Sequence, residues 1–160
     1  MNIDHNYLVH VEWLGNLGVG TENYRSYSRD NLLAAEGKPS IAGSADPSFR
    51  GSPERWNPEE LLVAALSQCH MLSYLHVAAV NGIVVTSYTD AATGAMRQTN
   101  DGGGHFTSVT LHPVVTISAG DPAVARSLHA EASAKCFIAQ SVNFAVLHEP
   151  TIILDDDERF

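Results

Sequence analysis

One long apolar segment constrains this chain more than any other feature of its sequence. The start of the segment carries the signals of a helix N-terminus. Asn57 is a capping residue, Pro58 suits the first helical position, and Glu60 stands at the capping-box position. Asn81-Gly82 is a helix stop. The sequence therefore predicts a helix over residues 57–81, about 35 Å long at 1.5 Å per residue.

The predicted helix is apolar nearly all round. Its length approaches that of a membrane span, but Ser67, Gln68, His70 and Ser73 interrupt the apolar run. These polar residues favour a buried helix of a soluble protein and no association with membranes. A chain of 160 residues forms one compact domain and has difficulty covering such a helix alone. Because two copies packed together would cover it, the sequence favours a homodimer.

The remaining segments are β-rich, apart from a second helix. Two strands are expected over residues 6–15 and 24–32, followed by a loop rich in Gly, Pro and Ser that extends to Trp56. A hairpin with the turn sequence NDGGG follows the first helix. Asp121 and Pro122 begin the second helix, and a strand closes the chain.

The predicted order of elements is β-β-α-β-β-α-β, which is a single α+β domain over residues 1–160. Residues 1–55 hold the N-terminal strands and the long loop, and residues 57–81 form the first central helix. Residues 82–160 hold the second hairpin, the second helix and the final strand.

The charge of the chain limits its partners. The formal net charge is −9, to which the acidic end DDDERF contributes. Nucleic acid and anionic membrane surfaces both require positive patches, so we expect neither as a partner. The first residues lack the basic start of a signal peptide, and there are two cysteines, so we expect a reducing, cytoplasmic location. In that compartment a cysteine pair is more often catalytic, redox-active or metal-binding than a permanent crosslink.

The two cysteines, Cys69 and Cys136, each lie on their own predicted helix. Taken singly, a free cysteine is most often a small buried apolar residue. If the two helices pack as neighbours, with axes about 8–10 Å apart, the two sulfurs come close to each other. A disulfide then requires Cα atoms within about 7 Å.

A reactive cysteine must be a thiolate, which needs positive charge nearby. Four arginines precede the first helix and are the candidate sources of that charge: Arg25, Arg29, Arg50 and Arg55. Glu59 would orient one of them, although a glutamate in a first turn also interacts with the helix dipole alone. Glu59 precedes Cys69 by ten residues, about 15 Å along a helix, so either a long arginine spans the gap or the glutamate comes from a partner chain.

A metal site is the minor alternative. Cys69, Cys136, His70 and His76 are possible ligands for a soft metal. However, His70 points about 100° away from Cys69 on a helix, and the sequence has neither CxxC nor HExxH. We therefore expect no metal and no other cofactor.

Two segments resemble a known family, the OsmC/Ohr thiol-dependent hydroperoxide reductases. The segment NPEELLVAALSQCHM is similar to the signature in which a reactive cysteine follows Asn-Pro-Glu by an apolar helix. The segment KCFIAQSV resembles the second cysteine region, where the family usually has Cys-Pro-Val-Ser and this chain has Cys136-Phe-Ile-Ala. The order of elements and the separation of the two cysteines also fit, and the similarity extends weakly over nearly the whole chain.

The resemblance implies an α+β protomer in an intertwined dimer, with two central helices wrapped by β-sheets and two sites at the interface. It implies Cys69 as the peroxidatic cysteine, Cys136 as the resolving cysteine and Glu59 as the carboxylate that orients an arginine. The family's arginine lies before the first helix. Arg29 and Arg50 are both candidates here, and Arg25 is a third. The loop DPSFRGSPERW looks longer than in better-known members, which bears on substrate preference.

The implied function is reduction of organic hydroperoxides in oxidative-stress defence. Cys69 attacks the peroxide, Cys136 forms a disulfide with it, and an external dithiol, such as a lipoyl-type one, reduces the disulfide. One alternative is an OsmC-like protein that binds a hydrophobic ligand and has inert cysteines. Another is a redox sensor whose disulfide changes its conformation. Turnover distinguishes the three, because only an enzyme consumes peroxide over many cycles.

Overall fold

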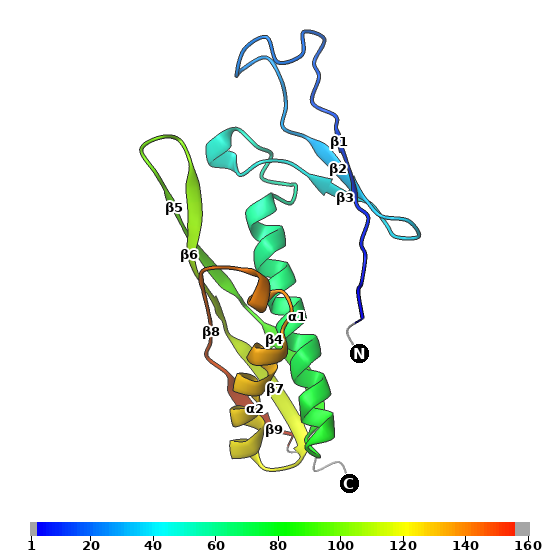
Figure 1. The fold of residues 1–160 in the computed structure, drawn as a ribbon, viewed down its shortest axis with the longest axis vertical. Helices are drawn as coiled ribbons and strands as arrows, with labels where there is room; N and C mark the ends of the chain where they lie inside the picture. Colours follow the sequence, from blue (N-terminus) through cyan, green and yellow to red (C-terminus); the bar gives the residue numbers. More distant parts are fainter. Residues whose placement is uncertain (1–2, 156–160) are drawn as a thin grey trace. The chain divides into compact units, whose positions relative to one another are not determined.

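The computed structural model describes residues 3–155, and most of the acidic end lies outside this range. The fold is α+β, as expected, with two α-helices and several small sheets (Figure 1). The chain divides into two compact units, residues 1–62 and residues 63–160. Helix α1 (Pro58–Val80) begins in the first unit and continues into the second.

The first unit contains one antiparallel sheet with the strand order β1-β2-β3. Its strands are β1 (His10–Trp13), β2 (Asn31–Ala34) and β3 (Ile41–Gly43), and a 3₁₀ helix η1 (Pro47–Phe49) follows them. Strand β3 lies in the segment that was expected to be loop. A three-residue strand is too short to show a period in the sequence, and it forms here because Leu32 and Leu33 of β2 pair with it.

The predicted second strand is shorter than expected at its N-terminal end. Residues 24–30 precede β2 and form a loop that is held by hydrogen bonds within itself and to the segment after β1. Ser26 N donates to Asn23 O at 3.1 Å, and Ser28 N donates to Gly15 O at 2.9 Å. The tyrosines that suggested a strand therefore belong to a loop, which matters for Arg29 below.

Helix α1 begins and ends where its sequence signals indicate. Glu60 N donates to Asn57 Oδ1 at 2.8 Å, and Asn57 N donates to Glu60 Oε2 at 3.2 Å, which is the reciprocal capping box. At the other end Gly82 has a φ of 71°, the left-handed conformation that terminates helices. The predicted boundaries 57–81 are confirmed to within one residue at each end.

Two three-stranded sheets belong to the second unit, with the orders β4-β7-β9 and β5-β6-β8. The strands are β4 (Val84–Asp90), β5 (Thr93–Gln98), β6 (Gly104–Leu111), β7 (Pro113–Ala119), β8 (Ala145–His148) and β9 (Thr151–Leu154). Each long β-rich run of the sequence splits into two strands that join different sheets. Prolines mark two of the splits, Pro113 after β6 and Pro150 after β8, because proline has no N–H for a sheet ladder.

The core of the second unit lies between the two helices and strand β7. Helix α2 (Pro122–Lys135) is capped by Asp121, whose side chain accepts from Ala123 N at 2.7 Å. The core residues come from both helices, from β7 and from the residue just before β4: Tyr74, Val77, Ala78, Ile83, Val115, Ile117, Ala125, Leu128 and Ala132. Tyr74 donates its hydroxyl to Ala125 O at 3.1 Å, so a side chain of α1 is hydrogen-bonded to the backbone of α2.

Only one face of α1 is buried in the single chain. The buried positions follow the spacing of one helix face: Leu66, His70, Tyr74, Val77 and Ala78. Elsewhere on the helix Leu72 is 57% exposed and Val80 is 72% exposed. By length and composition alone α1 would suffice to cross a membrane, but its buried face belongs to a protein core. The expectation of burial on most sides is therefore not met within one chain.

Candidate functional site

The two cysteines are neighbours in the second unit. Cys69 lies in α1 and is partly buried, whereas Cys136 directly follows α2 and is fully buried. Both are free thiols. The core that joins α1 to α2 brings them together from positions 67 residues apart in the sequence.

The surroundings of Cys136 hold it in the protonated form. Burial raises the pKa of the Cys136 thiol to about 11, and the hydrogen bond and charge of Cys69 add to this rise. A donation from Ala139 N to Cys136 Sγ at 3.4 Å opposes it without reversing it. At neutral pH Cys136 is therefore a protonated thiol beside Cys69, and the two cysteines differ in burial.

In the first unit, the Arg29 guanidinium is enclosed by two tyrosines. It lies 4.2 Å from the ring centroid of Tyr24 and 4.1 Å from that of Tyr27, which are cation–π distances. Its Nη1 donates to Tyr27 O at 2.6 Å and its Nη2 donates to Tyr24 O at 2.7 Å. Arg29 therefore has its charge held within its own loop in this conformation.

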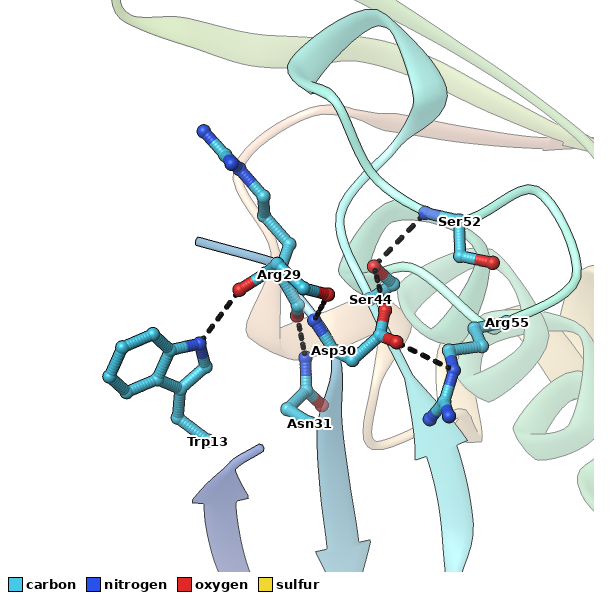
Figure 2. A network of polar contacts seen from close by, with 8 residues as sticks. Trp13, Arg29, Asp30, Asn31, Ser44, Ser52 and Arg55 are labelled. Carbon is cyan, nitrogen blue, oxygen red and sulfur yellow. Dashed lines mark hydrogen bonds and ion pairs between the residues drawn. The ribbon is translucent and has the colours of Figure 1, made fainter. Parts of the chain in front are cut away.

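The carboxylate of Asp30 ties β2 to the loop that leads to α1 (Figure 2). Ser44 Oγ donates to Asp30 Oδ1 at 3.1 Å, and Ser52 N donates to Ser44 Oγ at 3.1 Å. Arg55 Nε lies 3.4 Å from Asp30 Oδ2. Figure 2 shows the Arg29 side chain pointing away from this network. Arg55 is thereby occupied in a structural ion pair.

Arg50 differs from the other arginines in its backbone. Its φ is 66°, and among residues 3–155 it is the one non-glycine residue with a positive φ. It closes η1, with its N–H donating to Pro47 O at 3.0 Å. The structure describes no hydrogen bond or ion pair of the Arg50 guanidinium within residues 3–155. The same holds for the side chain of Arg25.

Glu59 carries an unpaired buried oxygen. Its Oε2 has no hydrogen-bond partner in the part of the chain that the structure describes. A buried carboxylate oxygen without a donor is costly, so a hydrogen-bond donor or a cation at Oε2 would stabilise Glu59. Within residues 3–155 no arginine forms an ion pair with Glu59, so the expected arginine–glutamate pair stays a prediction.

The sequence interpretation missed a histidine pair in the core. His70 of α1 and His129 of α2 are both buried, and His70 Nε2 lies 3.0 Å from His129 Nδ1. Burial lowers the pKa of His70 to about 4 and that of His129 to about 3. The sequence contained one indication that His70 is buried. His70 shares a helix face with Leu66 and Tyr74, which are apolar or aromatic residues. Nothing local marked His129 as its partner.

No metal centre is evident among residues 3–155, where no group of three or more His, Cys, Asp and Glu residues is placed to hold an ion. His76, the other histidine considered as a ligand, is exposed on α1.

The family model described as OsmC-like protein matches residues 51–150. The chain belongs to the OsmC-like family. An OsmC-like protein of unknown function from Vibrio cholerae O1 biovar eltor is 33% identical, with 92% of this chain and 100% of that chain covered and a TM-score of 0.81. The comparison with curated proteins gave no match.

Several structures with lower identity share the fold of this OsmC-like protein. An organic hydroperoxide resistance protein from Legionella pneumophila is 18% identical, with 94% of this chain and 99% of that chain covered and a TM-score of 0.67. One from Elizabethkingia anophelis is also 18% identical, with 96% and 100% covered and a TM-score of 0.67. The structural neighbours of the family therefore include proteins named for hydroperoxide resistance.

The histidine pair predicts that acid destabilises the protein. Both pKa values lie below the ordinary histidine value of 6.5, so the unfolded chain takes up protons first as the pH falls. The free energy of unfolding should therefore decline from about pH 6.5 downward, through pH 4. Combining His70→Gln with His129→Asn removes both titrating groups and should flatten the decline, measured by urea unfolding at each pH. Equal slopes in the two proteins would contradict this assignment.

Proposed function

We propose that this OsmC-like protein reduces organic hydroperoxides with Cys69 and Cys136. The observation that carries the proposal is the contact between two unlike thiols, one fully buried and held protonated, the other partly exposed. Support comes from the family and from its structural neighbours named for organic hydroperoxide resistance. The position of Cys69 within an apolar helix suits a substrate with a hydrocarbon group.

In the first step the Cys69 thiolate attacks the terminal oxygen of the hydroperoxide. A sulfur–oxygen bond forms as the oxygen–oxygen bond breaks, and the leaving alkoxide takes up a proton to become the alcohol. Cys69 is then a sulfenic acid. Cys136 attacks the Cys69 sulfur, a disulfide forms, and water leaves. An external dithiol, such as a lipoyl-type one, reduces the disulfide and is itself oxidised to a disulfide.

An arginine paired with Glu59 would supply the positive charge that a thiolate requires. The unpaired Oε2 of Glu59 supports this role. Arg29 would have to leave its tyrosine enclosure to act, whereas Arg50 already has an unengaged guanidinium within the described residues. We retain both as candidates, with Arg25 third.

We also propose that the protein acts as a homodimer in the cytoplasm. A second copy would cover the exposed apolar positions of α1, represented by Leu72 and Val80, and those of the N-terminal segment, where Leu8 is 73% exposed and Val11 is 68% exposed. Burial of this surface is the driving force for association.

The two cysteines should respond differently to substitution. Cys69→Ser should abolish peroxide consumption, because a serine hydroxyl is not ionised near neutral pH. Cys136→Ser should consume about one equivalent and then stop, since nothing resolves the sulfenic acid. Rapid-mixing loss of cumene hydroperoxide and the intact mass of each variant test this. Continued turnover by Cys69→Ser would refute the proposal and favour a ligand-binding role, and a single oxidation of the wild type without turnover would favour a sensor.

Substitution should identify the activating arginine. Arg29→Ala or Arg50→Ala should slow the first step at neutral pH and have less effect at high pH, where the thiol ionises unaided. Arg55→Ala is the control for loss of a charge, since Arg55 is paired with Asp30. The first-step rate from pH 6 to pH 10 measures the effect. A loss that is the same at every pH would assign the residue to substrate binding or to structure instead.

Self-association should depend on the exposed face of α1. We expect sedimentation equilibrium at micromolar concentration to give twice the mass of one chain. Leu72→Glu should shift the protein toward monomer, because it places a charge on an apolar surface. Asn100→Glu, at the exposed tip between β5 and β6, adds the same charge and should have no effect. A monomeric wild type would rule out the dimer.

A further inference from the structure

A polar contact joins the two helices inside an otherwise apolar core. His70 is 2% exposed and His129 is 0% exposed, and His70 Nε2 lies 3.0 Å from His129 Nδ1. The ring centroids are 5.3 Å apart and the ring planes differ by 15°, so the imidazoles meet edge to edge. In this hydrogen bond one ring nitrogen carries the hydrogen and donates it. The other ring nitrogen accepts, so it must be unprotonated.

Neighbouring rings hold this pair in place. The Tyr74 ring lies over the face of His129 with centroids 3.9 Å apart, and its hydroxyl is tied to Ala125 O. His148 of β8 lies 5.6 Å from His70 and 6.2 Å from His129, centroid to centroid. The geometry of the pair is thus set by side chains from α1, α2 and β8.

The pair stands close to both cysteines along their helices. His70 directly follows Cys69 in α1, and His129 precedes Cys136 by seven residues, or about 10 Å along α2. Because a helix is stiff over two turns, the place at which α2 is fastened to α1 decides where Cys136 stands relative to Cys69. His129 Nε2 has no hydrogen-bond partner among the described residues, and the 3.0 Å contact uses His129 Nδ1. A helix spacing that broke this contact would leave two more buried imidazole nitrogens unpaired, which costs more than an ordinary hydrogen bond gains.

We propose that the hydrogen bond between His70 and His129 is a positioning device, which holds α1 and α2 at the spacing at which Cys69 and Cys136 form a disulfide. The inference rests on the proposed function only in taking this disulfide as a working state of the protein. The histidines take no part in the chemistry and act through the position of the two thiols.

The device is sensitive to acid. Protonation of both imidazoles removes the acceptor and places two like charges side by side in the core. The ionisable groups that face the pair are Tyr74 on α1, Arg126 on α2, Asp90 on β4 and His148 on β8. Of these, the Asp90 carboxylate alone favours the charged imidazole, and its effect on the pKa of His70 is smaller than that of burial.

Equilibration of the full-length protein with a glutathione buffer tests the proposal without any peroxide. Two protein thiols and oxidised glutathione give the protein disulfide and two reduced glutathione molecules, and the ratio at equilibrium reports the effective concentration of the thiols. His129→Leu should lower this effective concentration by about fivefold, the factor that one lost hydrogen bond corresponds to. Combining His70→Gln with His129→Asn rebuilds a side-chain hydrogen bond and should restore most of it.

His105→Gln is the matched control, because His105 is an exposed histidine of β6, away from both helices. Circular dichroism confirms that each variant is folded, and His129→Ala, which also lacks a hydrogen-bonding group, replaces His129→Leu if the latter is not. The wild-type disulfide should also lose stability relative to the rebuilt amide pair as the pH falls below 5, because the pKa values of about 4 and about 3 place protonation of the pair there, and both proteins have the same thiols.

The proposal is overturned if folded His129→Leu, or its replacement, keeps the wild-type ratio. It is also overturned if His105→Gln lowers the ratio as much, or if the pH profiles of wild type and the amide pair coincide. Absence of a disulfide in the wild type overturns it as well. A protein that forms the disulfide normally but consumes no peroxide would refute the proposed enzymatic function and leave the positioning role in place.

Discussion

The packing of one face of α1 against α2 and strand β7 is the contact on which the rest of the second unit depends. Tyr74, Val77 and Ala78 bury themselves against residues of α2 and β7, and the Tyr74 hydroxyl adds a hydrogen bond across the helix pair. Burial of apolar side chains supplies the driving force, and the hydrogen bond selects one alignment of the helices. The same alignment makes neighbours of the two cysteines, so the core and the thiol site cannot be separated.

The two thiols differ in burial because they occupy different places on the packed helices α1 and α2. Cys136 terminates α2 inside the core, where burial favours the uncharged thiol. Cys69 lies on α1 at the margin of the buried face and retains partial exposure. Two identical side chains are thereby placed at different depths, Cys136 fully buried and Cys69 partly exposed.

The arginines of the first unit differ in whether their guanidinium groups already have partners. Arg55 is paired with Asp30, and Arg29 is enclosed by Tyr24 and Tyr27, whereas Arg50 has a left-handed backbone and an unengaged side chain within the described residues. Left-handed backbone in a non-glycine residue is held only where its surroundings require it. These local contacts, rather than the number of arginines, decide which guanidinium groups of the first unit are already engaged.

The sequence by itself determined the two helices and the residues that cap or terminate them. Asn57 and Glu60 cap α1, Asp121 caps α2, and Gly82 ends α1, because capping uses side chains only a few residues from the backbone groups they satisfy. The α+β class followed from such local signals. The choice of both cysteines as candidates followed from their places on the two predicted helices and from the resemblance to a known family.

Only the tertiary structure decided which residues from distant segments meet. Strand β3 forms because β2 is available to pair with it, and His129 becomes the partner of His70 from 59 residues away. Arg29 is occupied because the loop before β2 turns two tyrosines onto its guanidinium. The physical reason is common to all three. Burial, ring stacking and strand pairing act between groups that the fold brings together, and no period or cap in the sequence records them.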